Sequence, residues 1–308
     1  MPELIPPRPQ YAKERMRFGY PVLPAFLSLF LLRLLARHLP TAFSSPWLML
    51  LLQFGVFLLP TLLFIRARGR GYSRTLRLHR PYVAHIPLLL SAFFALFSGA
   101  LLLSILCGGI RSLGNSATAY ESVVPSSIWA ALAILPVLAV LPAILEELMF
   151  RGILFAELDR RGALRAILVS ALLFALIHFD LANLPVYFYA GVLLALVLYA
   201  TDSLPATMLL HATYNLCSLL GQRYVNAFYH FTGSVELFLF FLILVLLISL
   251  LFFCRECAKL YRQRVEAEVR PPRRDIPRDV QLYTMLDVLG CWPVILCLAI
   301  SILGFILL

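Results

Sequence analysis

About nine apolar stretches, each close to 20 residues long, run along the 308-residue chain and limit what it can fold into. Hydrophobic residues make up 61% of the sequence, charged residues only 14%, and the mean hydropathy is +0.89, which is outside the range of soluble proteins. Because backbone polar groups inside a bilayer must bond within the protein, we predict an all-α polytopic membrane protein. We expect a bundle of about eight to nine transmembrane helices, beginning near Tyr20, Trp47, Ile86, Ser126, Ala163, Leu184, Leu204, Val235 and Thr284.

The net charge of +10 is best interpreted as a topology signal rather than as a sign of nucleic-acid binding. Lys and Arg residues crowd into the N-terminal tail and into residues 66–80, 151–165 and 255–278. If all spans cross, these groups share one side, which predicts a cytoplasmic N-terminus and, in a bacterium, the plasma (inner) membrane. The first span carries Arg33 and Arg37. If it instead lies along the membrane surface, the tail changes sides.

We predict three regions along the chain. Residues 1–120 form an N-terminal transmembrane region of about three spans, and residues 121–222 form a central region of further spans. Residues 223–308 form a C-terminal transmembrane region with a basic cytoplasmic loop. The loops at 66–80 and 255–279 are expected to be solvated linkers. The Cys254 and Cys257 pair is interpreted as ordinary membrane-edge cysteines, since no second pair completes a metal site.

An adjacent carboxylate pair, Glu146 and Glu147, ends one of the apolar runs, where ionised side chains are expensive to bury. Glu147 lies 15 residues before the Arg161-Gly162 turn, and His178 lies 16 residues after Gly162. At 1.5 Å per residue both lie about 22–24 Å from the turn, so we expect them to face each other across a helical hairpin. Glu147 also precedes Arg151 by four residues, which is the favourable order for a helical ion pair.

The second hairpin helix, residues 163–179, is short, and Asp180, Asn183 and Pro185 follow it. We therefore predict a short helix that ends inside the bilayer around a protein-lined or watery cavity. The span that begins near Leu204 places His211 and Asn215 on one helix face, at a depth matching the glutamates. Each of these residues alone is more often a contact between helices than a catalyst. Together they are too costly to accumulate for packing, which indicates a functional site.

At these residues the chain resembles the CPBP intramembrane proteases, also called Abi proteins, which include the Rce1-type CAAX prenyl endopeptidases. The family pattern Glu-Glu-x-x-x-Arg is met by Glu146, Glu147 and Arg151, followed by Gly152. The pattern Phe-x-x-x-His is met by Phe174 and His178, and His-x-x-x-Asn is met by His211 and Asn215. The resemblance covers about residues 126–222, and it implies that the central region, residues 121–222, is the catalytic core. It implies hydrolysis of peptide bonds near the cytoplasmic membrane face.

The residue chemistry suits such a reaction. Glu146 is expected to take a proton from water, which becomes the nucleophile, while His178 holds that water or shuttles the proton. His211 and Asn215 are expected to stabilise the oxyanion. The supporting residues are Glu147 and Arg151, which would hold the motif helix, and Phe174, which would pack.

No cofactor is favoured, and zinc is the alternative. Glu146 or Glu147 with His178 and His211 could supply zinc ligands. Against zinc, the chain lacks a His-Glu-x-x-His motif, and the resemblance favours a glutamate-based site without metal.

The expected partners are the lipid bilayer and a membrane-associated peptide or protein, with a lipid-modified, CAAX-like chain as one form of it. Nucleic acid is not expected. Two other classes stay open: a non-catalytic membrane scaffold or bacteriocin-immunity protein that binds a peptide, and a transporter that relays protons. The absence of an inverted repeat in the sequence argues against the transporter.

Overall fold

The computed structural model describes residues 19–38, 46–69, 71–108, 134–159, 162–266 and 278–308. The basic residues of the N-terminal tail, the beginning of the fourth span and the Arg161 turn lie outside these ranges, as do residues 267–277 of the loop at 255–279. Residues 255–266, expected to belong to a solvated linker, instead continue the long helix α13 (Val235–Glu266). Every regular element within them is helical, in agreement with the all-α prediction. The elements before the carboxylate pair are α2 (Gly19–His38), α3 (Pro46–Gln53), η1 (Phe54–Leu58), α4 (Leu59–Arg68), η2 (Tyr72–Leu76), η3 (Val83–His85) and α5 (Ile86–Gly108).

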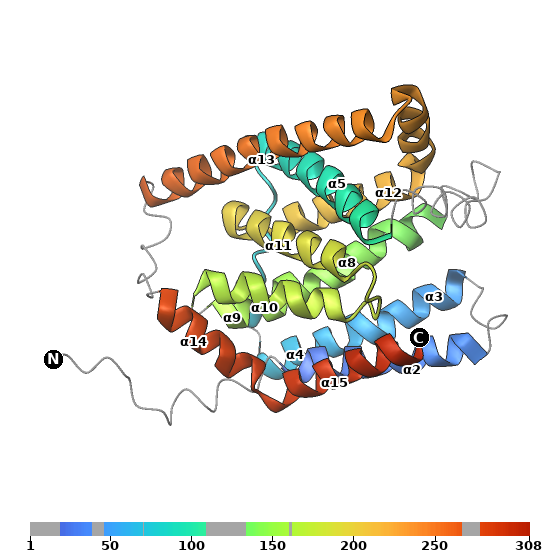
Figure 1. The fold of residues 1–308 in the computed structure, drawn as a ribbon. Coiled ribbons are helices and arrows are strands. Elements are labelled where there is room, and N and C mark those ends of the chain that lie inside the picture. Colours follow the sequence, from blue (N-terminus) through green and yellow to red (C-terminus); the bar gives the residue numbers. More distant parts are fainter. Residues whose placement is uncertain (1–18, 39–45, 70, 109–133, 160–161, 267–277) are drawn as a thin grey trace.

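The carboxylate pair lies in one helical run that comprises η4 (Pro136–Val140), α8 (Leu141–Glu147), η5 (Leu148–Leu154) and α9 (Phe155–Asp159). The helices that follow are α10 (Ala163–Leu176), α11 (Leu184–Thr201), α12 (Leu204–Thr232), α13 (Val235–Glu266), α14 (Arg278–Leu289) and α15 (Trp292–Leu307). Helix α10 packs on α11, α11 on α5, and α5 on α13, while α2 lies against α15 and α4 (Figure 1).

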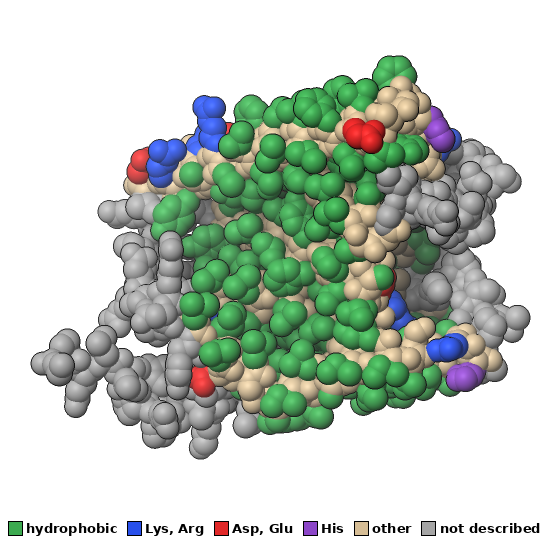
Figure 2. All heavy atoms as spheres, viewed as in Figure 1, with side chains coloured by type: hydrophobic (Ala, Val, Ile, Leu, Met, Phe, Trp, Pro, Cys, Tyr) green, Lys and Arg blue, Asp and Glu red, His purple; other side chains and the backbone are tan. Residues whose placement is uncertain are grey.

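An apolar belt covers the face seen in Figure 2, and the charged and histidine side chains gather toward its two ends. Five described helical segments are long and apolar enough to cross a membrane, namely 19–38, 51–68, 83–108, 184–201 and 235–263. Two shorter apolar helices, α10 and α15, lie among them. The polytopic all-α fold is therefore confirmed, while the total of eight to nine spans stays a prediction.

The first apolar segment, α2, is part of the bundle. Its residues Val22, Ala25 and Phe26 are buried in the main hydrophobic core. Its two arginines donate hydrogen bonds to backbone carbonyl oxygens of other elements, Arg33 to His178 and Arg37 to Leu307. The side of the membrane that the N-terminus faces stays a prediction.

Proline accounts for irregular hydrogen bonding in the helix that carries the glutamates. Pro142 has no N–H to donate to the carbonyl of Leu138, so the regular α pattern fails there. Instead, Leu141 N–H bonds to Pro136 across a π-helical turn, and a second π-helical turn follows Glu147, where Phe155 N–H bonds to Phe150. Such turns are frequent at functional sites because they change the direction in which side chains project.

The short second hairpin helix is confirmed. Helix α10 has 14 residues, about 21 Å in length, and is followed by a non-helical segment before α11. Phe179, in that segment, has a left-handed φ of 50° and is buried against Phe26 and Phe30 of α2. Gly304 of α15 permits this close packing, because a Cβ there would lie 2.4 Å from the Phe179 ring. The tip of the hairpin therefore ends within the protein.

The structure around the basic residues 66–80 differs from the solvated linker that the sequence predicts. Residues 66–80 were expected to be solvated, yet Arg68 donates two hydrogen bonds to Glu157, at 2.5 and 2.6 Å. Arg77 contacts Asp159 at 2.6 Å and Asp202 at 3.1 Å. The acids that these arginines contact are buried, since the side chains of Glu157 and Asp159 on α9 are only 6% and 3% exposed. Desolvation on burial lowers the pKa of Arg77, although the nearby Asp202 opposes this. The loop is thus fastened to the helix ends by ion pairs.

Candidate functional site

Glu147 joins two of the sequence motifs through a single carboxylate oxygen. Its Oε1 accepts a hydrogen bond from Arg151 Nη1 at 2.8 Å, as the spacing of four residues predicts. The same oxygen lies 3.0 Å from Nδ1 of His211 on α12. The Glu147 and Arg151 side chains are both 0% exposed. A buried carboxylate without partners would be strongly destabilising, so these contacts fix α8 against α12.

Arg151 is held on its remaining sides by α10 and α11. Its Nη2 donates to the carbonyl of Gly191 at 3.1 Å, and its Cζ lies 4.3 Å from the centre of the Phe174 ring. Gly191 packs directly on α10, where a Cβ would come within 2.8 Å of the Ala171 Cα. Because only glycine allows this approach, α11 lies close enough for its carbonyl to accept from Arg151.

Phe174 packs, as expected, and it does so between the two histidines. Its ring meets His178 edge-on at 5.0 Å and His211 at 5.8 Å, measured between ring centres, and it contacts Phe150 at 5.4 Å. The Phe-x-x-x-His and His-x-x-x-Asn motifs are therefore in contact through this ring. Its apolar surface excludes water from one side of the site.

His178 is fixed by its own helix and by a tyrosine. Its Nδ1 lies 2.7 Å from the carbonyl oxygen of Phe174, and because a carbonyl only accepts, Nδ1 is the donor. The neutral ring then carries a free electron pair on Nε2. Tyr187 of α11 stacks on the imidazole at 3.9 Å between ring centres, with 13° between the planes.

Glu146 is the more accessible of the two glutamates. Its side chain is 15% exposed, and its Oε2 lies 3.9 Å from Nε2 of His211, beyond direct hydrogen bonding. Within the described ranges, no hydrogen bond or ion pair joins His178 to Glu146 or Glu147. The two motifs are linked indirectly, because the Phe174 ring contacts both His178 and His211, and His211 bonds to Glu147.

Asn215 follows His211 by one helical turn and, like His211, contacts the helical run that carries the two glutamates. Its Nδ2 donates to the carbonyl of Ala139, in the π-helical turn η4, at 3.2 Å. An amide group has two N–H donors and one acceptor oxygen, so this bond leaves one donor uncommitted. Asn215 thereby ties α12 to the helix of the glutamates.

The site lies deep in the bundle. Arg33, which bonds to the His178 carbonyl, follows Gly19 by 14 residues and precedes the end of α2 by five. This corresponds to about 21 Å along the helix axis.

The zinc alternative finds no ligand set in the described ranges. There, no group of three or more His, Cys, Asp and Glu side chains is arranged to hold a metal ion. We therefore derive no step through a metal.

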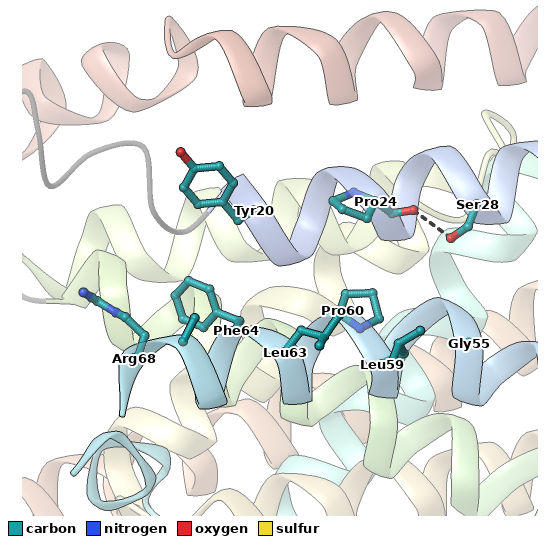
Figure 3. A pocket seen from close by; sticks show the side chains of 10 residues that line it. Tyr20, Pro24, Ser28, Gly55, Leu59, Pro60, Leu63, Phe64 and Arg68 are labelled. Atoms are coloured by element: carbon teal, nitrogen blue, oxygen red, sulfur yellow. Dashed lines mark hydrogen bonds between the residues drawn. The ribbon is translucent and has the colours of Figure 1, made fainter. Parts of the chain in front are cut away.

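Two hollows lie near these helices. A groove of about 650 Å³ runs between α2 and α4, lined by Tyr20, Pro24, Leu63 and other mostly apolar residues, with Arg68 at one end (Figure 3). None of the predicted site residues lines it. A smaller cavity of about 250 Å³ lies between α5, α11 and α12, and its lining includes Asn183, Tyr187 and Tyr214. This cavity adjoins the site, because Tyr187 stacks on His178.

Sequence reasoning missed three contributors to the site. Tyr187 and Gly191 carry no motif, although a glycine within an apolar helix is a weak indication of close packing. Arg33 was noticed only as a charge within a span. Its contact with His178 joins residues 145 positions apart, which no local pattern reveals.

Comparison with known families identifies one match. Residues 127–217 match the family model Rce1-like, described as type II CAAX prenyl endopeptidase Rce1-like. This segment contains all seven motif residues and is less than a third of the chain. The match confirms the resemblance noted from the sequence. None of the curated proteins and none of the solved structures matches the chain.

Proposed function

We propose, from the match of residues 127–217 to the Rce1-like type II CAAX prenyl endopeptidases, that the chain is a glutamate-type intramembrane endopeptidase acting on membrane-associated peptides. The observation that carries the proposal is the shared oxygen of Glu147, which bonds to Arg151 and to His211. This oxygen joins two motifs. Glu146, the other member of the carboxylate pair, forms no hydrogen bond among the described residues. One glutamate is thus structural and the other is available for chemistry.

Glu146 acts as the general base in this proposal. Its carboxylate is partly exposed and accepts no hydrogen bond from the described residues, so it can bind a water molecule and take a proton from it. Water bound at Glu146 gives up this proton and attacks the carbonyl carbon of the scissile peptide bond. The proton then passes to the leaving amine as the C–N bond breaks.

His178 orients the attacking water. Because Nδ1 donates to the Phe174 carbonyl, Nε2 of the neutral ring accepts a hydrogen bond from a water O–H. The Tyr187 stack and the Phe174 edge contact hold the ring plane in place, which supports a fixed water position.

His211 and Asn215 stabilise the oxyanion. Nδ1–H of His211 donates to the carboxylate of Glu147. In this proposal the ring also carries a proton on Nε2, and this Nε2–H donates to the oxyanion. Asn215 adds its uncommitted amide N–H from one turn further along the same helix. Two donors on one face are suited to the charge that develops on the carbonyl oxygen.

The substrate in this proposal is a peptide or protein held at the membrane, with a lipid-modified, CAAX-like chain as the first candidate. Its lipid would stay in the bilayer while the peptide enters between the helices. The proposed orientation, with a cytoplasmic N-terminus, rests on the distribution of basic residues.

The test compares cells that express the wild type and Glu146→Gln at equal levels, using quantitative mass spectrometry of membrane-derived peptides. Glutamine keeps the shape of the side chain and removes the base, so we expect fragments that appear only with the wild type. Glu236→Gln, at an exposed acid of α13, is the matched control and should give the wild-type fragments.

Identical peptide sets from the wild type and Glu146→Gln would refute proteolysis and would favour a non-catalytic peptide-binding or immunity protein. Thermal unfolding of both proteins in detergent shows whether the substitution leaves the fold intact. The fragments themselves would identify the substrate.

A further inference from the structure

Arg33 is an exposed cation on the apolar helix α2, directly beside the candidate active site. Its Nη1 donates to the backbone carbonyl of His178, and its guanidinium lies 5.9 Å from the centre of the Phe179 ring. Among the residues that the structure describes, no carboxylate lies within 4.0 Å of its nitrogens. Asp180 and Glu146 contribute to the electrostatic field at Arg33 without pairing with it.

A guanidinium in an apolar helix is expensive unless an anion compensates its charge. One neutral carbonyl uses one of the five N–H donors that an arginine carries. The natural complement of the remaining donors is a planar anion that accepts two parallel hydrogen bonds, above all a carboxylate. In a site that hydrolyses peptides, the substrate itself can bring such a group.

We propose that Arg33 binds the C-terminal carboxylate of the peptide substrate and thereby selects chains that end shortly after the scissile bond. This inference rests on the proposed function. Because Arg33 bonds to His178, and an extended residue spans about 3.3–3.6 Å, only a few residues separate the carboxylate from the bond that is cut. Arg33 lies outside the matched segment 127–217, so this selection is contributed by the N-terminal region of the chain.

Arg37 provides a matched comparison on the same helix face. It follows Arg33 by four residues and also donates to a backbone carbonyl, that of Leu307 at the end of α15. It has no contact with any motif residue within the described ranges. A purely structural role, in which arginine satisfies a carbonyl at a helix end, would apply to both arginines equally.

The experiment uses the full chain in phosphatidylcholine nanodiscs and pairs of peptides that differ only in a free or an amidated C-terminus. For the wild type we expect kcat/KM to favour the free acid by about 10–100-fold, the value of hydrogen bonds to a charged group. Arg33→Gln should bring the ratio of acid to amide close to one, Arg33→Lys should retain part of it, and Arg37→Gln should retain all of it.

Several results would overturn the inference. They are an equal preference of the wild type for both peptides, an unchanged ratio in Arg33→Gln, and a parallel loss on both peptides. The last result would assign Arg33 to the support of the His178 carbonyl or to the phosphate of a lipid. Binding of both peptides to Glu146→Gln separates this question from catalysis, because that variant keeps Arg33. A preference for the acid in binding without any turnover by the wild type would refute the proposed function and support the carboxylate site.

Discussion

Replacement of Arg151 by methionine tests the ion pair at the centre of the site. Methionine retains much of the side-chain volume and removes the charge, the hydrogen bond to Glu147 and the bond to the Gly191 carbonyl. It leaves the fully buried Glu147 with His211 as its remaining partner. Removing one partner of a buried ion pair costs about 3–5 kcal/mol. With about 2–4 °C per kcal/mol for chains of some 200 residues, the unfolding midpoint should fall by about 6–20 °C.

The assay is thermal unfolding of purified protein in detergent, with the double variant Glu147→Gln and Arg151→Met beside the two single variants. If the two side chains form one unit, the double variant loses much less stability than the sum of the single losses. Arg223→Gln is the control, since Arg223 is exposed on α12 and bonds only to the neighbouring Tyr224 within the described ranges. An Arg151→Met midpoint equal to that of the wild type, or strictly additive losses, would refute the reasoning.

Three further predictions concern the chemistry. Asn215→Leu should lower kcat by about 10²–10³-fold, the loss typical of one oxyanion donor, which single-turnover assays measure; an unchanged kcat would remove Asn215 from the mechanism. Tyr187→Leu should lower kcat by about tenfold while KM stays nearly constant, because an aromatic pair contributes about 0.5–1.5 kcal/mol to the position of the His178 ring. Protein treated with a chelator and shown by mass spectrometry to be free of zinc should keep full activity, whereas recovery only on adding zinc would restore the metal alternative.

Much of this molecule could be predicted from composition and spacing. Apolar stretches near 20 residues long predict membrane helices because the thickness of the hydrocarbon fixes their length. The spacing of Glu147 and Arg151 predicts their ion pair because residues four apart lie on one helix face. The same local geometry predicts that His211 and Asn215 share a face, and helix length predicts the short α10.

The tertiary structure decided which groups meet across helices. Glu147 bonds to His211, which is 64 positions away, and this contact distinguishes the role of Glu147 from that of Glu146. Arg33 bonds to the backbone of His178, which is 145 positions away. The loop at 66–80, expected in solvent, is fastened by Arg68 and Arg77 to acids of later segments. Periodicity shows which face a residue occupies, but the partner of that face depends on how the helices pack. The sequence by itself therefore determined the membrane setting and the motif residues, whereas the division of labour among them follows from long-range contacts that only the folded chain creates.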